Sequence, residues 1–196
     1  MDIVSNRIFM ITSSGFFSVY DSKTFEVIYK KKFNKTAFLL ESFKLSNLVM
    51  IVFEHDIIVL DSSTDTITFD DLKEYSLTLN TITMAKINTN EKLLAVATVS
   101  AAQPEVTLFA IDNGFAKLKQ IFGFKSSVKY LDFSSDNYYM QIEDTVGEVT
   151  LYEIETDRPI QTDAIDFELE WLGEGLRTYQ KLKGVRHQYN QHNKIV

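Results

Sequence analysis

VKYLDF-SSDN-YYMQI, residues 128 to 142, is the stretch of sequence that decides the fold class. Apolar and polar residues alternate in Val128 to Phe133 and again in Tyr138 to Ile142, which is typical of β-strands with one buried face. Between them, Ser134-Ser135-Asp136-Asn137 carry short polar side chains that bond to the local backbone and favour tight turns. A strand, a turn and a second strand predict a β-hairpin here.

The same kind of unit recurs along the chain. An alternating stretch ends in an acid followed by a small polar residue at Val19-Tyr20-Asp21-Ser22, Val59-Leu60-Asp61-Ser62, Ala110-Ile111-Asp112-Asn113 and Glu153-Ile154-Glu155-Thr156. The acids of these segments, which are Asp21, Asp61, Asp112 and Glu155, are 40, 51 and 43 residues apart. The longest interval contains an insertion at Val99 to Gln103. WD40 repeats, each of four antiparallel strands, have a period of about 40–45 residues.

Each repeat divides into short strands separated by turn residues. The expected strands are Arg7 to Thr12, Phe16 to Asp21 and Phe25 to Phe33; Ala37 to Phe43, Leu48 to Phe53, Ile57 to Asp61 and Thr66 to Phe69; Thr81 to Ile87, Leu93 to Val99, Val106 to Ile111 and Ala116 to Phe122; and Val128 to Phe133, Tyr138 to Ile142, Glu148 to Ile154 and Pro159 to Gln161. Asp70 to Leu79 is expected to form a loop or a turn of helix.

These features predict an all-β protein. The expected fold is a WD40-type β-propeller, with about four to five blades of four antiparallel strands over residues 1–185 and a polar tail or linker over residues 186–196. A β-sandwich whose strand ends are acidic is the alternative that the pattern leaves open. A seven-bladed ring needs roughly 280 residues. We therefore expect a longer polypeptide or another chain to complete the ring, with a closed four-bladed ring as the other possibility.

Composition and charge argue against several classes of protein. A formal charge of −7 and a pI near 5.0 argue against a nucleic-acid binder. The absence of cysteine excludes disulfides and cysteine-based zinc sites. The longest apolar run, Leu48 to Phe53, is far shorter than the ~20 residues of a membrane helix, and the first residues lack a secretory signal. We therefore expect a cytoplasmic protein with neither a nucleic acid nor a membrane as partner.

No motif predicts catalysis, a metal or a cofactor. His55 lies at a turn between two expected strands, while His187 and His192 are five residues apart in the polar tail, which fits no metal-binding motif. Gly173-Glu174-Gly175 lacks the third glycine of a nucleotide-binding fingerprint. The carboxylates show no spacing that marks a catalytic pair; they include Asp70, Asp71, Asp163, Asp166, Glu168 and Glu170. We therefore expect no catalytic, metal or cofactor residues and a non-enzymatic protein.

The marked acids and the large aromatic residues have expected structural roles. We expect Asp21, Asp61 and Asp112 to accept hydrogen bonds from turn amides. Trp171, Tyr130, Phe133 and Tyr152 are expected in the core rather than at a partner surface.

The last third of the chain resembles the echinoderm microtubule-associated-protein-like (EMAP-like) family of WD40 proteins. Ser126 to Asp136 is similar to that family's blade opening, and Tyr138 to Gln141 with Gly147 to Tyr152 is similar to its next two strands. Glu170-Trp171 and Gly184-Val185 match a later motif of the family by spacing. Two departures are Arg186, where the family has Trp, and the lack of any Trp-Asp dipeptide.

This resemblance implies tandem propellers, microtubule association and a place in the cilium or axoneme. The expected partners are then tubulin or neighbouring axonemal proteins, bound by a scaffold of the cytoskeleton. The alternative is a WD40 adaptor in another cytoplasmic complex, such as a trafficking or ubiquitin-ligase complex.

One local concentration of basic residues stands out: Lys30, Lys31, Lys32 and Lys35. Because tubulin presents an acidic surface, these lysines are candidates for partner binding by electrostatic attraction. The other interpretation is a solvent-facing outer strand whose lysines protect it from edge-to-edge pairing.

Overall fold

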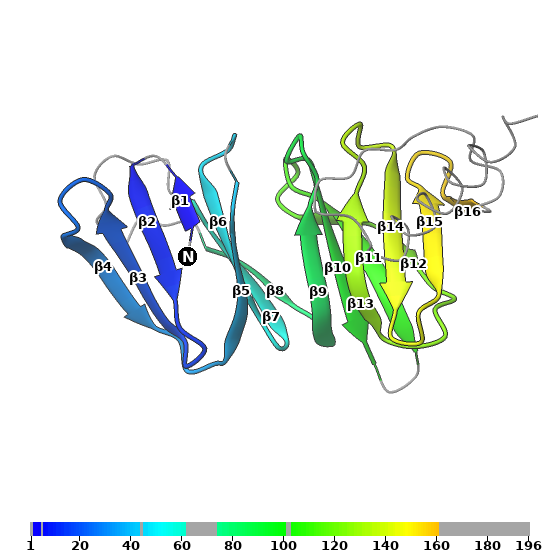
Figure 1. Ribbon diagram of the computed structural model, residues 1–196, viewed down its shortest axis with the longest axis horizontal. Coiled ribbons are helices and arrows are strands. Elements are labelled where there is room, and N and C mark those ends of the chain that lie inside the picture. The colour runs from blue at the N-terminus through cyan, green and yellow to red at the C-terminus, as the bar shows by residue number, and fades with distance from the viewer. Residues whose placement is uncertain (1, 5, 44, 62–73, 101–102, 161–196) are drawn as a thin grey trace, which may run out of the picture.

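The computed structural model describes residues 2–4, 6–43, 45–61, 74–100 and 103–160, and these are folded entirely as β-strands and turns. The strands form four antiparallel sheets of four strands each (Figure 1). Sheet 1 contains β1 (Asp2–Val4), β2 (Arg7–Ile11), β3 (Phe16–Asp21) and β4 (Val27–Lys32); sheet 2 contains β5 (Ala37–Ser42), β6 (Leu48–Phe53), β7 (Asp56–Asp61) and β8 (Glu74–Thr78). Sheet 3 contains β9 (Thr81–Ile87), β10 (Leu93–Val99), β11 (Pro104–Ala110) and β12 (Ala116–Ile121); sheet 4 contains β13 (Val128–Phe133), β14 (Tyr139–Asp144), β15 (Val149–Glu153) and β16 (Arg158–Ile160).

The four sheets stand side by side in chain order, with sheets 1 and 4 at the two ends of the row (Figure 1). Each sheet is a meander in which every strand pairs with its neighbours in sequence. First strands of adjacent sheets lie close together, since β1 contacts β5 and β9 contacts β13. The fourth strands are therefore the outer edges of the sheets. This all-β arrangement is compatible with part of a propeller.

Three apolar cores lie between consecutive sheets. Sheets 1 and 2 share a core that includes Phe9, Phe17, Val19, Phe33, Val49, Ile51 and Phe53. Sheets 2 and 3 share one that includes Phe43, Met50, Val52, Ile82, Leu94, Val96 and Phe109. Sheets 3 and 4 share one that includes Ala95, Ala97, Leu108, Leu131, Phe133, Met140 and Ile142. Each of sheets 1 to 3 thus buries a face against the next sheet in the chain.

Sheets 2 and 3 are buried on both faces, which explains their continuous apolar runs. Side chains alternate between the two faces of a strand, so in β6 Val49 and Ile51 face sheet 1 while Met50 and Val52 face sheet 3. All four side chains are fully buried, at 0% exposure. The run Leu48–Phe53 is therefore a central strand of a sheet packed on both faces.

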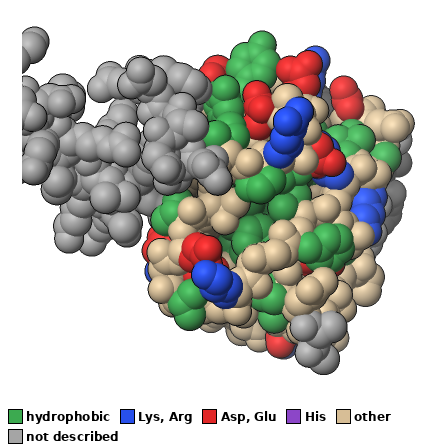
Figure 2. Space-filling model, turned by 90° about the vertical axis from the view of Figure 1, so that its right-hand side faces the viewer, with side chains coloured by type: hydrophobic (Ala, Val, Ile, Leu, Met, Phe, Trp, Pro, Cys, Tyr) green, Lys and Arg blue, Asp and Glu red, His purple; other side chains and the backbone are tan. Residues whose placement is uncertain are grey.

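The sheet 4 end of the row presents apolar side chains on its surface. Figure 2 shows the sheet 4 end, where hydrophobic side chains lie across the middle of the face with charged side chains of both signs around them. Leu151, Tyr139 and Ile160 form a small apolar cluster of their own in sheet 4.

Turns between the first and second strands repeat one backbone conformation. Asn6 and Asn47 lie one residue before the second strand of sheets 1 and 2, Glu91 and Asn137 lie two residues before that of sheets 3 and 4, and their φ values are 62°, 55°, 54° and 65°. Asparagine is among the few residues with a side chain that tolerate this left-handed region well. The structural repeat is thus visible in the backbone as well as in the strand order.

Comparison with the expected strands shows agreement in sheets 3 and 4 and three differences elsewhere. β1 was not expected, because Asp2–Val4 is too short to show an alternating pattern. β4 is shorter than the expected Phe25 to Phe33, since Phe25 has a left-handed backbone in the preceding turn. The interpretation of Asp70 to Leu79 as a loop or a turn of helix was wrong, because β8 occupies Glu74–Thr78 and pairs with β7.

Several other expectations fall outside the described residues. They are the strand Thr66 to Phe69, the boundary between residues 1–185 and 186–196, Trp171, and the matched Glu170-Trp171 and Gly184-Val185.

Candidate functional site

The four lysines of the basic concentration do not form one surface. Lys30, Lys31 and Lys32 lie on β4, the outer edge strand of sheet 1. Strand pairing places Lys30 opposite Ser18 and Lys32 opposite Phe16, on the face of sheet 1 that points away from sheet 2. Lys31 pairs with the buried Phe17 and therefore points to the other side.

Aromatic rings and one carboxylate further separate these lysines. The ammonium of Lys32 lies 4.8 Å from the centre of the Phe16 ring, and that of Lys31 lies 5.0 Å from the Phe33 ring. Lys35 pairs with Asp56 in sheet 2, at 2.7 Å between Nζ and Oδ2. Two of the four predicted residues, Lys30 and Lys32, thus share an exposed surface.

Basic residues recur on other outer edge strands. β12 carries Lys117 and Lys119, and β16 carries Arg158. Exposed lysines therefore lie on the outer strands of sheets 1 and 3, as Lys30, Lys32 and Lys117, in a chain whose formal charge is −7. Lysine on an edge strand also opposes pairing with a second sheet edge.

A groove of about 400 Å³ lies between the outer parts of sheets 3 and 4. Its lining combines aromatic and polar side chains from β12, the segment that follows β12, and β15 with its turn into β16. The lining residues are Gln120, Ile121, Phe122, Gly123, Phe124, Thr150, Tyr152, Asp157 and Pro159. Phe122 is half-exposed, which places an aromatic ring within reach of a ligand.

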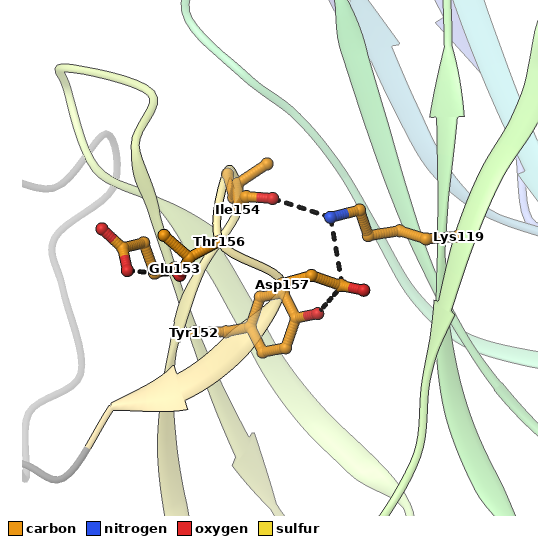
Figure 3. Close-up of polar contacts among 6 residues, drawn as sticks. All are labelled: Lys119, Tyr152, Glu153, Ile154, Thr156 and Asp157. Atoms are coloured by element: carbon orange, nitrogen blue, oxygen red, sulfur yellow. Dashed lines mark hydrogen bonds and ion pairs between the residues drawn. The ribbon is translucent and has the colours of Figure 1, made fainter.

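A polar network holds one rim of this groove (Figure 3). Lys119 donates a hydrogen bond to the backbone carbonyl of Ile154 at 2.7 Å and pairs with Oδ1 of Asp157 at 3.1 Å. The hydroxyl of Tyr152 donates to the same Oδ1 atom. In the same turn, the Thr156 hydroxyl bonds to the Glu153 carboxylate. Both contacts to Asp157 thus use Oδ1 and leave Oδ2 without a hydrogen-bond partner among the described residues.

The protonation states of this network follow from its contacts. The Tyr152 hydrogen bond, followed by Lys119, holds the pKa of the Asp157 carboxyl below its ordinary value of 3.8. Burial raises the pKa of the Tyr152 hydroxyl, and its contact with Asp157 adds to that effect. At neutral pH the carboxylate is therefore charged and the tyrosine neutral.

Expectations for structural residues can be compared with the contacts. Asp21 accepts hydrogen bonds from the amides of Lys23 and Thr24, both at 2.8 Å, as expected. Phe133 and Tyr152 are buried core residues as expected. Tyr130 is half-buried and donates a hydrogen bond to Asp132 at 3.2 Å, and burial followed by that carboxylate raises the Tyr130 pKa to about 12.

Sequence reasoning missed most of the groove. Lys119, Phe122 and Asp157 carried no motif, and Tyr152 was assigned to the core alone. A usable signal was Phe122-Gly123-Phe124, because two aromatic residues around a glycine follow directly on a lysine-rich strand.

Other candidate chemistry can be placed only where the chain is described. Across residues 2–160 with their gaps, no group of three or more His, Asp or Glu side chains could hold a metal ion. His55 is exposed in its turn, 3.6 Å from Glu54. Asp70, Asp71, the acids from Asp163 to Glu170, the Gly173 segment, His187 and His192 lie outside the described residues. A helix long and apolar enough to span a membrane does not occur in the described ranges.

Comparison with known proteins leaves the family open. No family model matches the chain. No curated protein matches it either. The resemblance to the EMAP-like family therefore stays a prediction.

Proposed function

We propose that this chain is a non-catalytic scaffold built from propeller-type sheets, which binds other proteins and associates with microtubules. The observation that carries the proposal is the basic outer rim. Lys30 and Lys32 of β4 and Lys117 of β12 are exposed on edge strands of an acidic chain. A basic rim is complementary to an acidic protein surface such as that of tubulin.

The outer strands suit partner binding better than the faces of the sheets do. Faces of sheets 1 to 4 pack on neighbouring sheets, and the exposed apolar residues at the ends of the row suit further sheets of a ring. In this proposal the ring is completed by another chain or by further segments of a longer polypeptide. Outer edge strands stay accessible at the circumference of such a ring, since Lys117 of β12 lies opposite Phe109 on the side of sheet 3 that sheet 2 covers and is still exposed.

Microtubule co-sedimentation tests the proposal. The full chain is expected to pellet with polymerised tubulin at low salt and to be released as salt screens the charges, within a Debye length of about 10 Å at 0.1 M. Lys30→Glu with Lys32→Glu should weaken pelleting, because both side chains are exposed and their charge is reversed. Lys23→Glu with Lys92→Glu is the matched control, since these exposed lysines lie in turns rather than on edge strands.

Three outcomes are informative. Loss of pelleting in the edge-strand variant alone supports the basic rim as the contact surface. Equal loss in both variants indicates a response to net charge only and contradicts the assignment of the rim. A wild-type chain that stays in the supernatant overturns the microtubule proposal and favours an adaptor in another complex.

A further inference from the structure

The groove between sheets 3 and 4 has features that the basic rim does not explain. Its Asp157 carboxylate is held in place through Oδ1 by two donors, Tyr152 and Lys119. Asp157 is also 60% exposed. A charged acceptor is thus fixed in orientation at the surface, with its second oxygen available to a donor from outside.

The ammonium of Lys119, beside this carboxylate, already has its own partners. Lys119 is only 24% exposed and is satisfied by the Ile154 carbonyl and by Asp157. Lys119 meets Asp157 through Oδ1, so Oδ2 keeps no hydrogen-bond partner among the described residues, and a charged acceptor of this kind favours a cationic donor.

Aromatic residues complete the match to a cation. Phe122 and Phe124 both line the groove, and Gly123 between them has a φ of +99°, which favours glycine. A cation over an aromatic ring is attracted by the negative face of the ring. The protein already uses this contact elsewhere, where Lys32 lies 4.8 Å from the Phe16 ring.

We propose that this groove binds an arginine or lysine side chain presented by an extended segment of a partner protein. The cationic head would meet Oδ2 of Asp157, and its stem and charge would lie against Phe122. Ile121 and Pro159 provide apolar surface for the neighbouring part of the segment. The proposal is independent of microtubule binding, since the rim is basic and seeks an acidic partner.

The test uses the ¹⁵N-labelled full chain and a short peptide as probe. An acetylated and amidated peptide with one arginine among glycines and serines is titrated while backbone amide resonances are followed. We expect binding with a Kd on the order of 1 mM, typical of a single-residue contact. Shifts should centre on the amides of Phe122, Gly123, Tyr152 and Asp157. The matched probe replaces arginine by citrulline, which has nearly the same shape without the charge.

Two variants and one control complete the design. Asp157→Asn keeps the shape and tolerates the left-handed backbone at this position, where φ is 60°. It should weaken binding of the arginine peptide about tenfold by loss of a charge-assisted contact. Phe122→Leu keeps an apolar side chain but removes the ring, and it should weaken binding several-fold. Glu155→Gln removes an exposed acid in the same turn that does not line the groove, and should leave binding unchanged.

Each result bears on the proposal. Equal binding of the citrulline peptide, or equal loss with Glu155→Gln, would show that the groove does not select a cation and overturns it. No shift at these amides overturns it as well. If Asp157→Asn lowers stability, Phe122→Leu decides, because that side chain is half-exposed and its change should leave the fold intact.

Discussion

The backbone amide of Thr89 donates a hydrogen bond of 3.0 Å to the side-chain oxygen of Asn137, 48 residues further along the chain. The Thr89 hydroxyl donates to the same oxygen at 2.7 Å. These bonds join the first turn of sheet 3 to the first turn of sheet 4. Adjacent sheets are therefore linked at their ends by specific polar contacts as well as by apolar cores.

Replacing Asn137 by glycine should show the contribution of this link. Glycine accepts the φ of 65° at this position but cannot bond to Thr89. We expect a loss of about 1 kcal/mol in the free energy of unfolding, measured by urea denaturation. Asn6→Gly is the control, because Asn6 has the same backbone conformation in sheet 1. Equal losses in both variants would mean that the Thr89 bonds contribute nothing.

Glu91 makes the corresponding link between sheets 2 and 3. Its Oε1 accepts the Leu45 amide at 2.8 Å, and its Oε2 accepts the Ser46 amide at 2.9 Å. Glutamine offers a single acceptor oxygen and no charge, so Glu91→Gln should lower the free energy of unfolding by about 1 kcal/mol. Thermal melts at matched pH will measure it, with Glu155→Gln as an exposed control. An unchanged free energy of unfolding in Glu91→Gln would show that one acceptor oxygen is sufficient for the link between sheets 2 and 3.

Gly15 is the glycine that the fold requires most strictly. It has a φ of +83°, and a Cβ there would lie 2.3 Å from the Phe33 carbonyl oxygen and 2.4 Å from that of Lys35. We expect Gly15→Ala to lower the free energy of unfolding by about 3 kcal/mol or more, from left-handed strain and backbone clash together. Gly147→Ala is the matched control, since its φ is +89° but its surroundings are open. It should cost about 1 kcal/mol. Similar costs would contradict the close approach.

Local signals in the sequence predicted much of the fold. Asp21 accepts bonds from amides two and three residues away, so its role depends on neighbours in sequence and could be predicted. The strands of sheets 3 and 4 could be predicted because polar turn residues next to them in sequence mark most of their ends. β8 was missed because Glu74–Thr78 alternates over too few residues to outweigh the polar segment before it.

Long-range relationships could not be predicted in this way. Lys119 reaches the carbonyl of Ile154, 35 residues away, only because sheets 3 and 4 stack. The separation of Lys31 from Lys30 and Lys32 depends on strand pairing, since a concentration in sequence is divided between two faces when it forms a strand. For this reason the groove could not be assembled from the sequence, although Phe122-Gly123-Phe124 marks part of its lining.

Asp157 should make stability depend on pH at the acid end. Its folded pKa lies below the ordinary 3.8, so its contribution is present above that pH and is lost as the pH falls through the folded pKa. The difference in unfolding free energy between wild type and Asp157→Asn should therefore be greatest near neutral pH and shrink below about pH 4. Urea denaturation across this range will measure it. If the difference stays constant with pH, the charge of the Asp157 carboxylate does not contribute to stability.

The two faces of β10 differ in side-chain size because sheet 3 packs on a different sheet on each side. Leu94 packs between sheets 2 and 3, whereas Ala97 packs between sheets 3 and 4 against a core that includes Phe133. Both side chains are fully buried, at 0% exposure. β10 also contacts β13 directly, so the alanine side has little room for a larger side chain.

Opposite changes of size on these two faces should both destabilise the chain. Ala97→Leu overpacks the closely spaced side and should cost about 1–3 kcal/mol of unfolding free energy. Leu94→Ala leaves a cavity on the other side and should cost about 2–5 kcal/mol. Leu118→Ala, at a residue 52% exposed on β12, is the control and should change stability by less than about 0.5 kcal/mol. A neutral Ala97→Leu would mean that sheet 4 does not pack on sheet 3 as described, because a covered face has no space for three more carbon atoms.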